Sequence, residues 1–179
     1  MKRSLAILSL VTLMAFTLGC QDQQALAELE VMKARAVVEE QNKALMQRSF
    51  EEWNKGSSDF FLGATSPDYA YYSPSGNPNA VSREETVESV EALWKGFPDL
   101  SLSIEEMIAA GDRLVVRYTM RGTHTGEFQG IPATGRGIEV SGIIISRVKD
   151  GQFVEERDEF DALGLMMQLG MELKPAAGS

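Results

Sequence analysis

The hydrophobic positions of the chain follow two different periods, and the change between them divides the sequence into two parts. From Ala25 to Trp53, apolar residues recur at steps of three and four with no Gly or Pro, which predicts a long helix. A second helix is predicted to start at Ser82, because Ser82 and Glu85 have the spacing of a capping box. Gly96 and Pro98 end this second helix.

From Leu100 onward the apolar residues alternate, which predicts four strands over residues 100–110, 113–123, 137–149 and 152–160. Asp150-Gly151 joins the last two strands, and this dipeptide between alternating segments is a strong hairpin signal. The segment from Ser66 to Asn79 carries prolines and tyrosines and predicts a short strand within a long loop. Helices followed by strands predict an α+β fold, in which helices cover the concave face of a curved antiparallel sheet.

The first residues are typical of a secretory signal. Lys2 and Arg3 precede an uncharged, mostly apolar run that ends at Leu18. This run is too short for a comfortable membrane span, which needs about 20 apolar residues. We therefore expect residues 1–19 to be a signal peptide.

Cys20 is the only cysteine of the chain, so no disulfide can form within it. Its place after "TLG" resembles the lipobox of bacterial lipoproteins, although Thr17 stands where leucine is usual. The resemblance implies a lipidated Cys20, export across the inner membrane and a lipid anchor at the bacterial cell envelope. Residues 20–27 would then be a lipidated tether and residues 28–175 the folded domain. The alternative is an ordinary cleaved signal with a cysteine there by chance.

The charge and histidine content exclude several classes of partner. The chain has 26 acidic and 17 basic side chains and a net charge of -9, which argues against nucleic acid as a partner. A single histidine, His124, cannot build a histidine-rich metal site, and the acidic residues show no metal-binding spacing. We expect neither a metal nor another cofactor.

Asp158 is the candidate for acid/base chemistry. A regular hairpin that pairs Lys149 with Gln152 sets Asp158 opposite Ile143, on a face with other apolar residues. Such neighbours raise the pKa of a carboxyl group, as acid/base catalysis near neutral pH requires. The alternative is an exposed carboxylate in an ion pair. On the same count Arg157 points to the other face. Asp161 lies at the start of the last predicted helix, and we expect it to cap that helix.

The other candidate residues of a ligand-binding site are His124, Ile144, Arg157, Asp161 and three tyrosines. His124 lies in a glycine-rich loop, where it either lines a pocket mouth or fixes the loop through a backbone hydrogen bond. Tyr69, Tyr71 and Tyr72 lie in the proline-broken segment and could form an aromatic wall for a small hydrophobic or cyclic molecule.

Residues 120–170 resemble the SnoaL-like polyketide cyclases, often labelled ester cyclases, which have the nuclear-transport-factor-2-like fold. The resemblance is carried by a His-x-Gly-x-x-x-Gly-Ile-Pro-x-Thr loop, an Arg-Asp-x-x-Asp stretch and a terminal Gln-Leu-Gly. In this chain these are His124, Gly126, Gly130, Ile131, Pro132, Thr134, Arg157, Asp158, Asp161, Gln168, Leu169 and Gly170. The resemblance implies a cone-shaped α+β domain with Asp158 as general acid/base. Ile144 stands where those cyclases carry a histidine, a departure within the expected ligand site.

Three functional hypotheses follow. The first is a cofactor-independent cyclase, isomerase or hydrolase, in which Asp158 takes a proton from carbon next to a carbonyl or activates a water. The second is a lipoprotein that binds a small hydrophobic molecule without chemistry, which the loss of histidine at Ile144 and the export signal favour. The third is a homodimeric interaction domain that associates through the outer sheet face.

Overall fold

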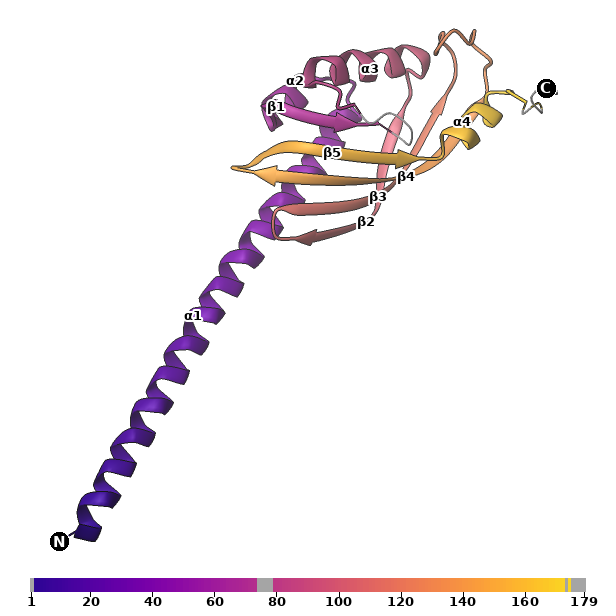
Figure 1. The fold of residues 1–179 in the computed structure, drawn as a ribbon. Helices are drawn as coiled ribbons and strands as arrows, with labels where there is room; N and C mark the ends of the chain where they lie inside the picture. Colours follow the sequence, from indigo (N-terminus) through magenta and orange to yellow (C-terminus); the bar gives the residue numbers. More distant parts are fainter. Residues whose placement is uncertain (1, 74–78, 173, 175–179) are drawn as a thin grey trace. The chain divides into compact units, whose positions relative to one another are not determined.

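The computed structural model describes residues 2–73, 79–172 and 174, with side chains from residue 23 onward. Two compact units divide the chain, one up to Val38 and one from Glu39. Helix α1 (Lys2–Trp53) belongs to both units (Figure 1). Its residues up to Val38 are in the first unit, and its remaining residues are in the second. The Cys20 side chain lies outside the described residues, so the signal peptide, the tether and lipidation stay predictions. Within the described part of the chain, no helix has the length and apolarity to cross a membrane.

The second unit is an α+β domain, as the sequence predicted. Its elements are the end of α1, α2 (Asp59–Ala64), β1 (Thr65–Tyr72), α3 (Arg83–Gly96), β2 (Ser101–Ala110), β3 (Arg113–Thr123), β4 (Gly137–Lys149), β5 (Gln152–Phe160) and α4 (Ala162–Gln168). The bounds of the four long strands match the predicted ones to within one residue. The capping box of Ser82 and Glu85 is present at the start of α3.

The expectation of a wholly antiparallel sheet was wrong. The five strands follow the order β1-β5-β4-β3-β2, and β2 to β5 are antiparallel, but β1 pairs with β5 in parallel. This pair joins the first strand to the last one. Because the chain between them is long, no local turn pattern specifies the direction of the pairing.

A second correction concerns the register of the β4–β5 hairpin. The turn is as predicted, since Asp150 and Gly151 both have positive φ (52° and 75°) and Lys149 pairs with Gln152. The pairing then shifts by one residue between Arg147 and Val148. Val154 is the extra residue on β5, a β-bulge, so Asp158 lies opposite Ile144 and not Ile143.

One face of the sheet carries the core. Leu114, Val116 and Phe153 on that face are fully or almost fully buried. A buried cluster on this face includes Tyr118, Met120 and Val140. Side chains of two helices pack against it, namely Phe50 and Trp53 of α1 and Leu93 and Trp94 of α3. α3 lies next to β1 (Figure 1). The helices therefore cover this face, as predicted for a curved sheet.

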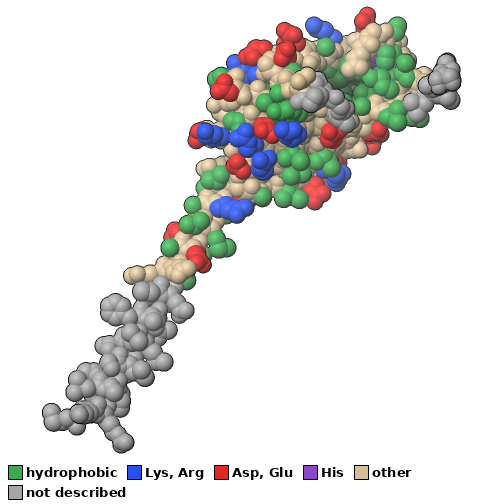
Figure 2. Space-filling model, viewed as in Figure 1, with side chains coloured by type: hydrophobic (Ala, Val, Ile, Leu, Met, Phe, Trp, Pro, Cys, Tyr) green, Lys and Arg blue, Asp and Glu red, His purple; other side chains and the backbone are tan. Residues whose placement is uncertain are grey.

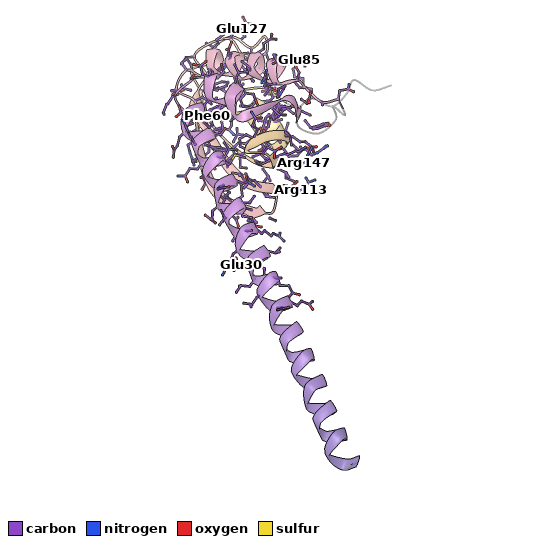
Figure 3. All side chains as sticks on the ribbon, turned by 90° about the vertical axis from the view of Figure 1, so that its left-hand side faces the viewer. Glu30, Phe60, Glu85, Arg113, Glu127 and Arg147 are labelled. Atoms are coloured by element: carbon purple, nitrogen blue, oxygen red, sulfur yellow. The ribbon has the colours of Figure 1, made fainter. Side chains whose placement is uncertain are left out.

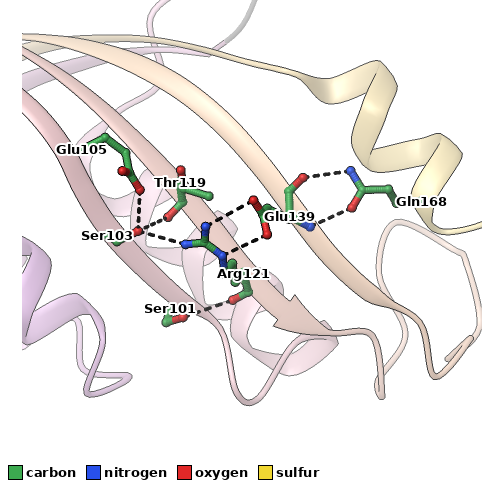
Figure 4. A network of polar contacts seen from close by, with 7 residues as sticks. All are labelled: Ser101, Ser103, Glu105, Thr119, Arg121, Glu139 and Gln168. Atoms are coloured by element: carbon green, nitrogen blue, oxygen red, sulfur yellow. Dashed lines mark hydrogen bonds and ion pairs between the residues drawn. The ribbon is translucent and has the colours of Figure 1, made fainter.

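Two side chains of the motif at the end of the chain hold α4 against the domain. Asp161 accepts a hydrogen bond from the Gly164 N–H at 2.7 Å and caps α4, as predicted. Gln168 makes two hydrogen bonds with the backbone of Glu139 on β4, at 2.7 and 2.9 Å (Figure 4). Both residues therefore have structural roles.

The opposite face of the sheet carries exposed side chains. Ile108, Val115 and Ile145 are in register across β2, β3 and β4 and are 55%, 37% and 39% exposed. Charged residues frame them, such as Arg113 and Arg147, which are paired across β3 and β4 and lie near each other in Figure 3. Figure 2 shows the mixture of basic, acidic and hydrophobic side chains on the visible side of the domain.

Candidate active site

A cavity of about 490 Å³ lies between the covered sheet face and the helices. Most of its wall is aromatic or aliphatic. These residues are Met46, Phe50, Trp53, Phe60, Phe61, Tyr69, Tyr71, Val81, Val87, Val90, Leu93, Trp94, Leu102, Tyr118, Met120, Phe128, Ile144, Phe160 and Leu165. The volume and lining are those of a site for a small apolar or cyclic molecule.

Asp158 lies in the cavity wall on β5. The Tyr118 hydroxyl is 3.0 Å from each of its carboxylate oxygens, and the Tyr71 hydroxyl donates to Oδ2 at 3.2 Å. Burial raises the pKa of Asp158 from 3.8 to about 6, against the lowering effect of the two tyrosine hydrogen bonds. Asp158 therefore changes protonation state in the pH range that acid/base catalysis uses.

Both tyrosines stay protonated and act as donors. The pKa values of Tyr71 and Tyr118 are raised first by burial and then by the negative charge of Asp158. Tyr118 approaches the carboxylate across Gly142 of β4, where a Cβ atom would lie 2.5 Å from its Cζ and Oη atoms. Gly142 thus gives the Tyr118 ring the room that it occupies beside Asp158.

A second carboxylate, Glu156, lines the same cavity. It precedes Asp158 by two residues on β5 and so shares its face. The Tyr69 hydroxyl donates to Oε2 at 2.5 Å, and the Ser146 hydroxyl donates to Oε1 at 2.6 Å. Burial raises the pKa of Glu156, and these two hydrogen bonds oppose the rise.

The charged side chains of the cavity lining are all acidic. Its ionisable residues other than tyrosines are Glu52, Glu156 and Asp158, and no Lys, Arg or His is among the described residues that line it. No described group of three or more His, Cys, Asp or Glu side chains has an arrangement that could hold a metal ion. Any ligand of this cavity therefore meets negative charge and aromatic surface.

The structure brings some of the predicted site residues together and places others elsewhere. Tyr69, Tyr71, Ile144 and Asp158 line the cavity, and Ile144 lies directly opposite Asp158 on β4.

Four candidates lie outside the cavity wall. The Arg157 guanidinium stacks on the Tyr72 ring at 3.9 Å, which places this pair on the other side of the sheet from Asp158. Asp161 caps α4. His124 is fully buried, stacks on Phe97 and contacts Thr134 through Nδ1 at 3.0 Å, so it fixes its loop.

Sequence reasoning missed Glu156, Ser146 and Tyr118. Glu156 carried a usable signal, because it lies two residues before Asp158 on a predicted strand. Ser146 and Tyr118 could be placed only after the bulge at Val154 and the β3–β4 register were known.

The fold and cavity define a class of α+β domains in which helices cover one face of a curved sheet and enclose a cavity there. A profile of the SnoaL-like polyketide cyclase family matches residues 43–169, and the chain belongs to this family. It is 28% identical over 134 residues to the aklanonic acid methyl ester cyclase DnrD of Streptomyces peucetius, which covers 70% of this chain and 88% of that protein.

Solved structures agree with this assignment. AclR, a proposed hydroxylase from Streptomyces galilaeus, has a TM-score of 0.69 and 32% identity, covering 74% of this chain and 97% of AclR. TsrD from Streptomyces laurentii has a TM-score of 0.64 and 31% identity, covering 73% of this chain and 95% of TsrD. Because a cyclase and a proposed hydroxylase both resemble this chain, the fold alone does not fix the reaction.

Proposed function

We propose that the protein is a cofactor-independent cyclase or isomerase in which Asp158 is the general acid/base. The observation that carries the proposal is the Asp158 carboxyl group, enclosed in an apolar cavity between two tyrosine hydroxyls with a pKa of about 6. The ionised form takes a proton from a carbon next to a ligand carbonyl and leaves an enolate. The protonated form then returns the proton to a different carbon of the conjugated enolate, which moves a double bond and completes an isomerisation without any other reactant.

The cavity supports this chemistry through its two tyrosines. Their hydroxyls hold the carboxylate in one orientation, which is a condition for efficient proton transfer. The aromatic residues of the wall reduce the contact of water with a reactive enolate. The relationship to an aklanonic acid methyl ester cyclase supports a small cyclic substrate with a carbonyl group.

Deuterium exchange tests the proposal with a simple ketone. Acetonaphthone carries a methyl group next to its carbonyl, and the protein in deuterated buffer should accelerate exchange of these protons, as followed by NMR. Asp158→Asn should lower the protein-dependent rate by about 10²- to 10⁴-fold, the usual contribution of a general base. Asp161→Asn is the matched control and should keep the rate, because Asp161 only caps α4. Equal exchange by wild type and Asp158→Asn would disprove the catalytic role.

A second candidate function is favoured by Ile144. The side chain that faces Asp158 across the β4–β5 ladder is apolar, where the family resemblance implies a histidine, so one polar partner for a substrate is missing. On this alternative the protein binds a small hydrophobic ligand and does no chemistry. Binding of acetonaphthone without any exchange would favour it.

We further propose that the chain is lipid-anchored at Cys20 in the cell envelope and forms a homodimer through its outer sheet face. The apolar residues Ile108, Val115 and Ile145 on that face support a dimer, because a contiguous exposed apolar row is a feature of interaction surfaces. Light scattering of wild type and Ile145→Lys tests it: wild type should have the mass of two chains and the variant that of one. A monomeric wild type at micromolar concentration contradicts the dimer.

A further inference from the structure

The turn between Phe128 and Ile131 holds a glutamine in an unfavourable backbone conformation. Phe128 and Ile131 exchange two backbone hydrogen bonds, of 3.1 and 2.9 Å, so Gln129 and Gly130 form the tight turn between them. Both turn residues have positive φ, 50° for Gln129 and 77° for Gly130. Gly, Asn and Asp adopt this conformation readily, whereas a longer side chain such as glutamine does so at a cost. Gln129 therefore lowers the stability of its own turn.

The β4–β5 hairpin has the same kind of turn with a favourable residue in it. Asp150 and Gly151 have φ values of 52° and 75°, close to those of Gln129 and Gly130. Gln129 and Asp150 are the non-glycine residues with positive φ in the described part of the chain. Gln129 lines the cavity, whereas Asp150 does not. The unfavourable residue thus stands in the turn that reaches the cavity, and strain kept at a ligand site indicates a functional contact.

The residue before Gln129 anchors the turn to the domain. Phe128 is 9% exposed, and its ring packs edge-on against that of Phe97 with the centroids 5.3 Å apart. It also lies close to the end of α3, where a Cβ atom on Gly96 would be 2.9 Å from the Phe128 Cβ. Gln129 itself is exposed. Because its side chain both lines the cavity and meets solvent, Gln129 lies at the cavity mouth.

The amide group of Gln129 is available to a ligand. Its side chain makes no hydrogen bond or ion pair with another described residue. An amide offers two N–H donors and one acceptor oxygen. Several hydroxyl groups of the lining already donate within the protein, and they belong to Tyr69, Tyr71, Tyr118, Thr86 and Ser89.

The rest of the lining indicates which ligand group this amide meets. Glu156 and Asp158 line the cavity without any described basic residue, so an anionic ligand would be repelled. Ile144, which lies opposite Asp158, offers no donor to a ligand oxygen. The aromatic wall suits an aromatic molecule. A neutral carbonyl oxygen on such a molecule is an acceptor that an amide N–H matches.

We propose that Gln129 is a ligand-binding residue whose side-chain amide donates to a carbonyl oxygen of an uncharged aromatic ligand at the cavity mouth. This inference rests on the proposed use of the cavity as a ligand site, but not on catalysis by Asp158. The stability lost in the turn is then the cost of placing this amide at the mouth. Glycine would suit the turn better but would bring no amide.

Two probes of nearly the same shape test the contact. Acetonaphthone has a ketone oxygen where isopropenylnaphthalene has a CH₂ group. In calorimetry, wild type should bind the ketone about three- to tenfold more tightly, as one net hydrogen bond allows. Gln129→Gly should abolish this preference, whereas Asp150→Gly, the matched change in the turn outside the cavity, should keep it. Persistence of the preference in Gln129→Gly would overturn the proposal.

Nitrogen-15 labelling gives a readout within wild type. Each glutamine side chain gives a pair of amide N–H signals, and the pair that is missing from Gln129→Gly belongs to Gln129. Gln129→Asn gives the same assignment if the glycine variant fails to fold. Acetonaphthone should move this pair further downfield than isopropenylnaphthalene does. An equal response to both probes contradicts the hydrogen bond.

The cost of the turn has its own measurement. In urea unfolding, Gln129→Asn should raise the midpoint, because asparagine adopts positive φ more readily than glutamine. Asp150→Gln places glutamine in the matching turn and should lower the midpoint without changing the affinity for the ketone. A midpoint that falls in Gln129→Asn would show that glutamine is not strained here, and the inference would lose its basis.

The outcomes separate this inference from the proposed function. If the ketone preference depends on Gln129 but wild type gives no deuterium exchange, the catalytic proposal fails and this one stands. Exchange that Asp158→Asn abolishes, together with a preference that survives in Gln129→Gly, gives the reverse result. A wild type that binds neither probe overturns both.

Discussion

Replacement of Asp158 by asparagine should stabilise the folded protein at neutral pH. The folded-state pKa of Asp158 is about 6 and the ordinary value is 3.8, so the ionised carboxylate is less favourable in the fold than in the unfolded chain. The sign follows from linkage. The stability that protonated Asp158 contributes is fully present below about pH 3.8 and is lost as the pH rises through about 6.

The magnitude follows from the same difference in pKa. A rise from 3.8 to about 6 corresponds to about 3 kcal/mol of unfolding free energy at pH 7.5. Asparagine has nearly the same shape and keeps an oxygen that accepts from Tyr118, but it carries no charge. We expect Asp158→Asn to be more stable than wild type by about 1 to 3 kcal/mol at pH 7.5, and about equally stable at pH 4.

Urea unfolding at both pH values measures the difference. Glu156 also has a raised pKa, but it is present in both proteins and largely cancels when they are compared at each pH. Asp161→Asn is the control, since asparagine caps helices about as well as aspartate and should change little at either pH. A variant less stable than wild type at pH 7.5, or a difference that does not depend on pH, would refute the reasoning from burial.

Three further predictions concern other parts of the chain. Glu156→Gln removes a neighbouring negative charge and should move the Asp158 titration, followed by carbon NMR, below pH 6; an unchanged midpoint would show that the two groups are not coupled. Gly142→Ala should clash with Tyr118, lower exchange activity and destabilise the fold by about 1 to 3 kcal/mol in urea unfolding, and wild-type values for both would contradict the close approach. Cys20→Ala, expressed in a bacterium and fractionated, should leave the membrane fraction, whereas retention like wild type would contradict lipidation.

Much of the fold could be predicted because its signals are local. The capping box of Ser82, the turn at Asp150-Gly151 and the cap at Asp161 each depend on residues within a few positions. The long strands follow from alternation alone. The direction of β1 could not be predicted, because its partner β5 lies about 80 positions further along the chain.

The candidate site was predictable only in part for a related reason. Counting from the turn sets Asp158 opposite Ile143, whose side chain lies on the exposed face, and the extra residue Val154 moves Asp158 opposite Ile144 on the covered face. A bulge has no strong sequence signature when no glycine marks it. Tyr118 and Ser146 come from other strands, so their contacts with the two carboxylates needed the three-dimensional register.

The bulge at Val154 makes the chemistry of the cavity depend on chain length as well as on side-chain identity. In a regular ladder that included Val154, Arg157 would lie opposite Ile144 and enter the cavity, and Asp158 would lie opposite Ile143 on the exposed face. Deletion of Val154 with the turn kept would leave Asp158 opposite Ile144, because Val154 is outside the ladder. A single residue inserted into the ladder between Glu155 and Arg157 would instead exchange a buried acid for a buried cation, and change a pocket that repels anions into one that attracts them.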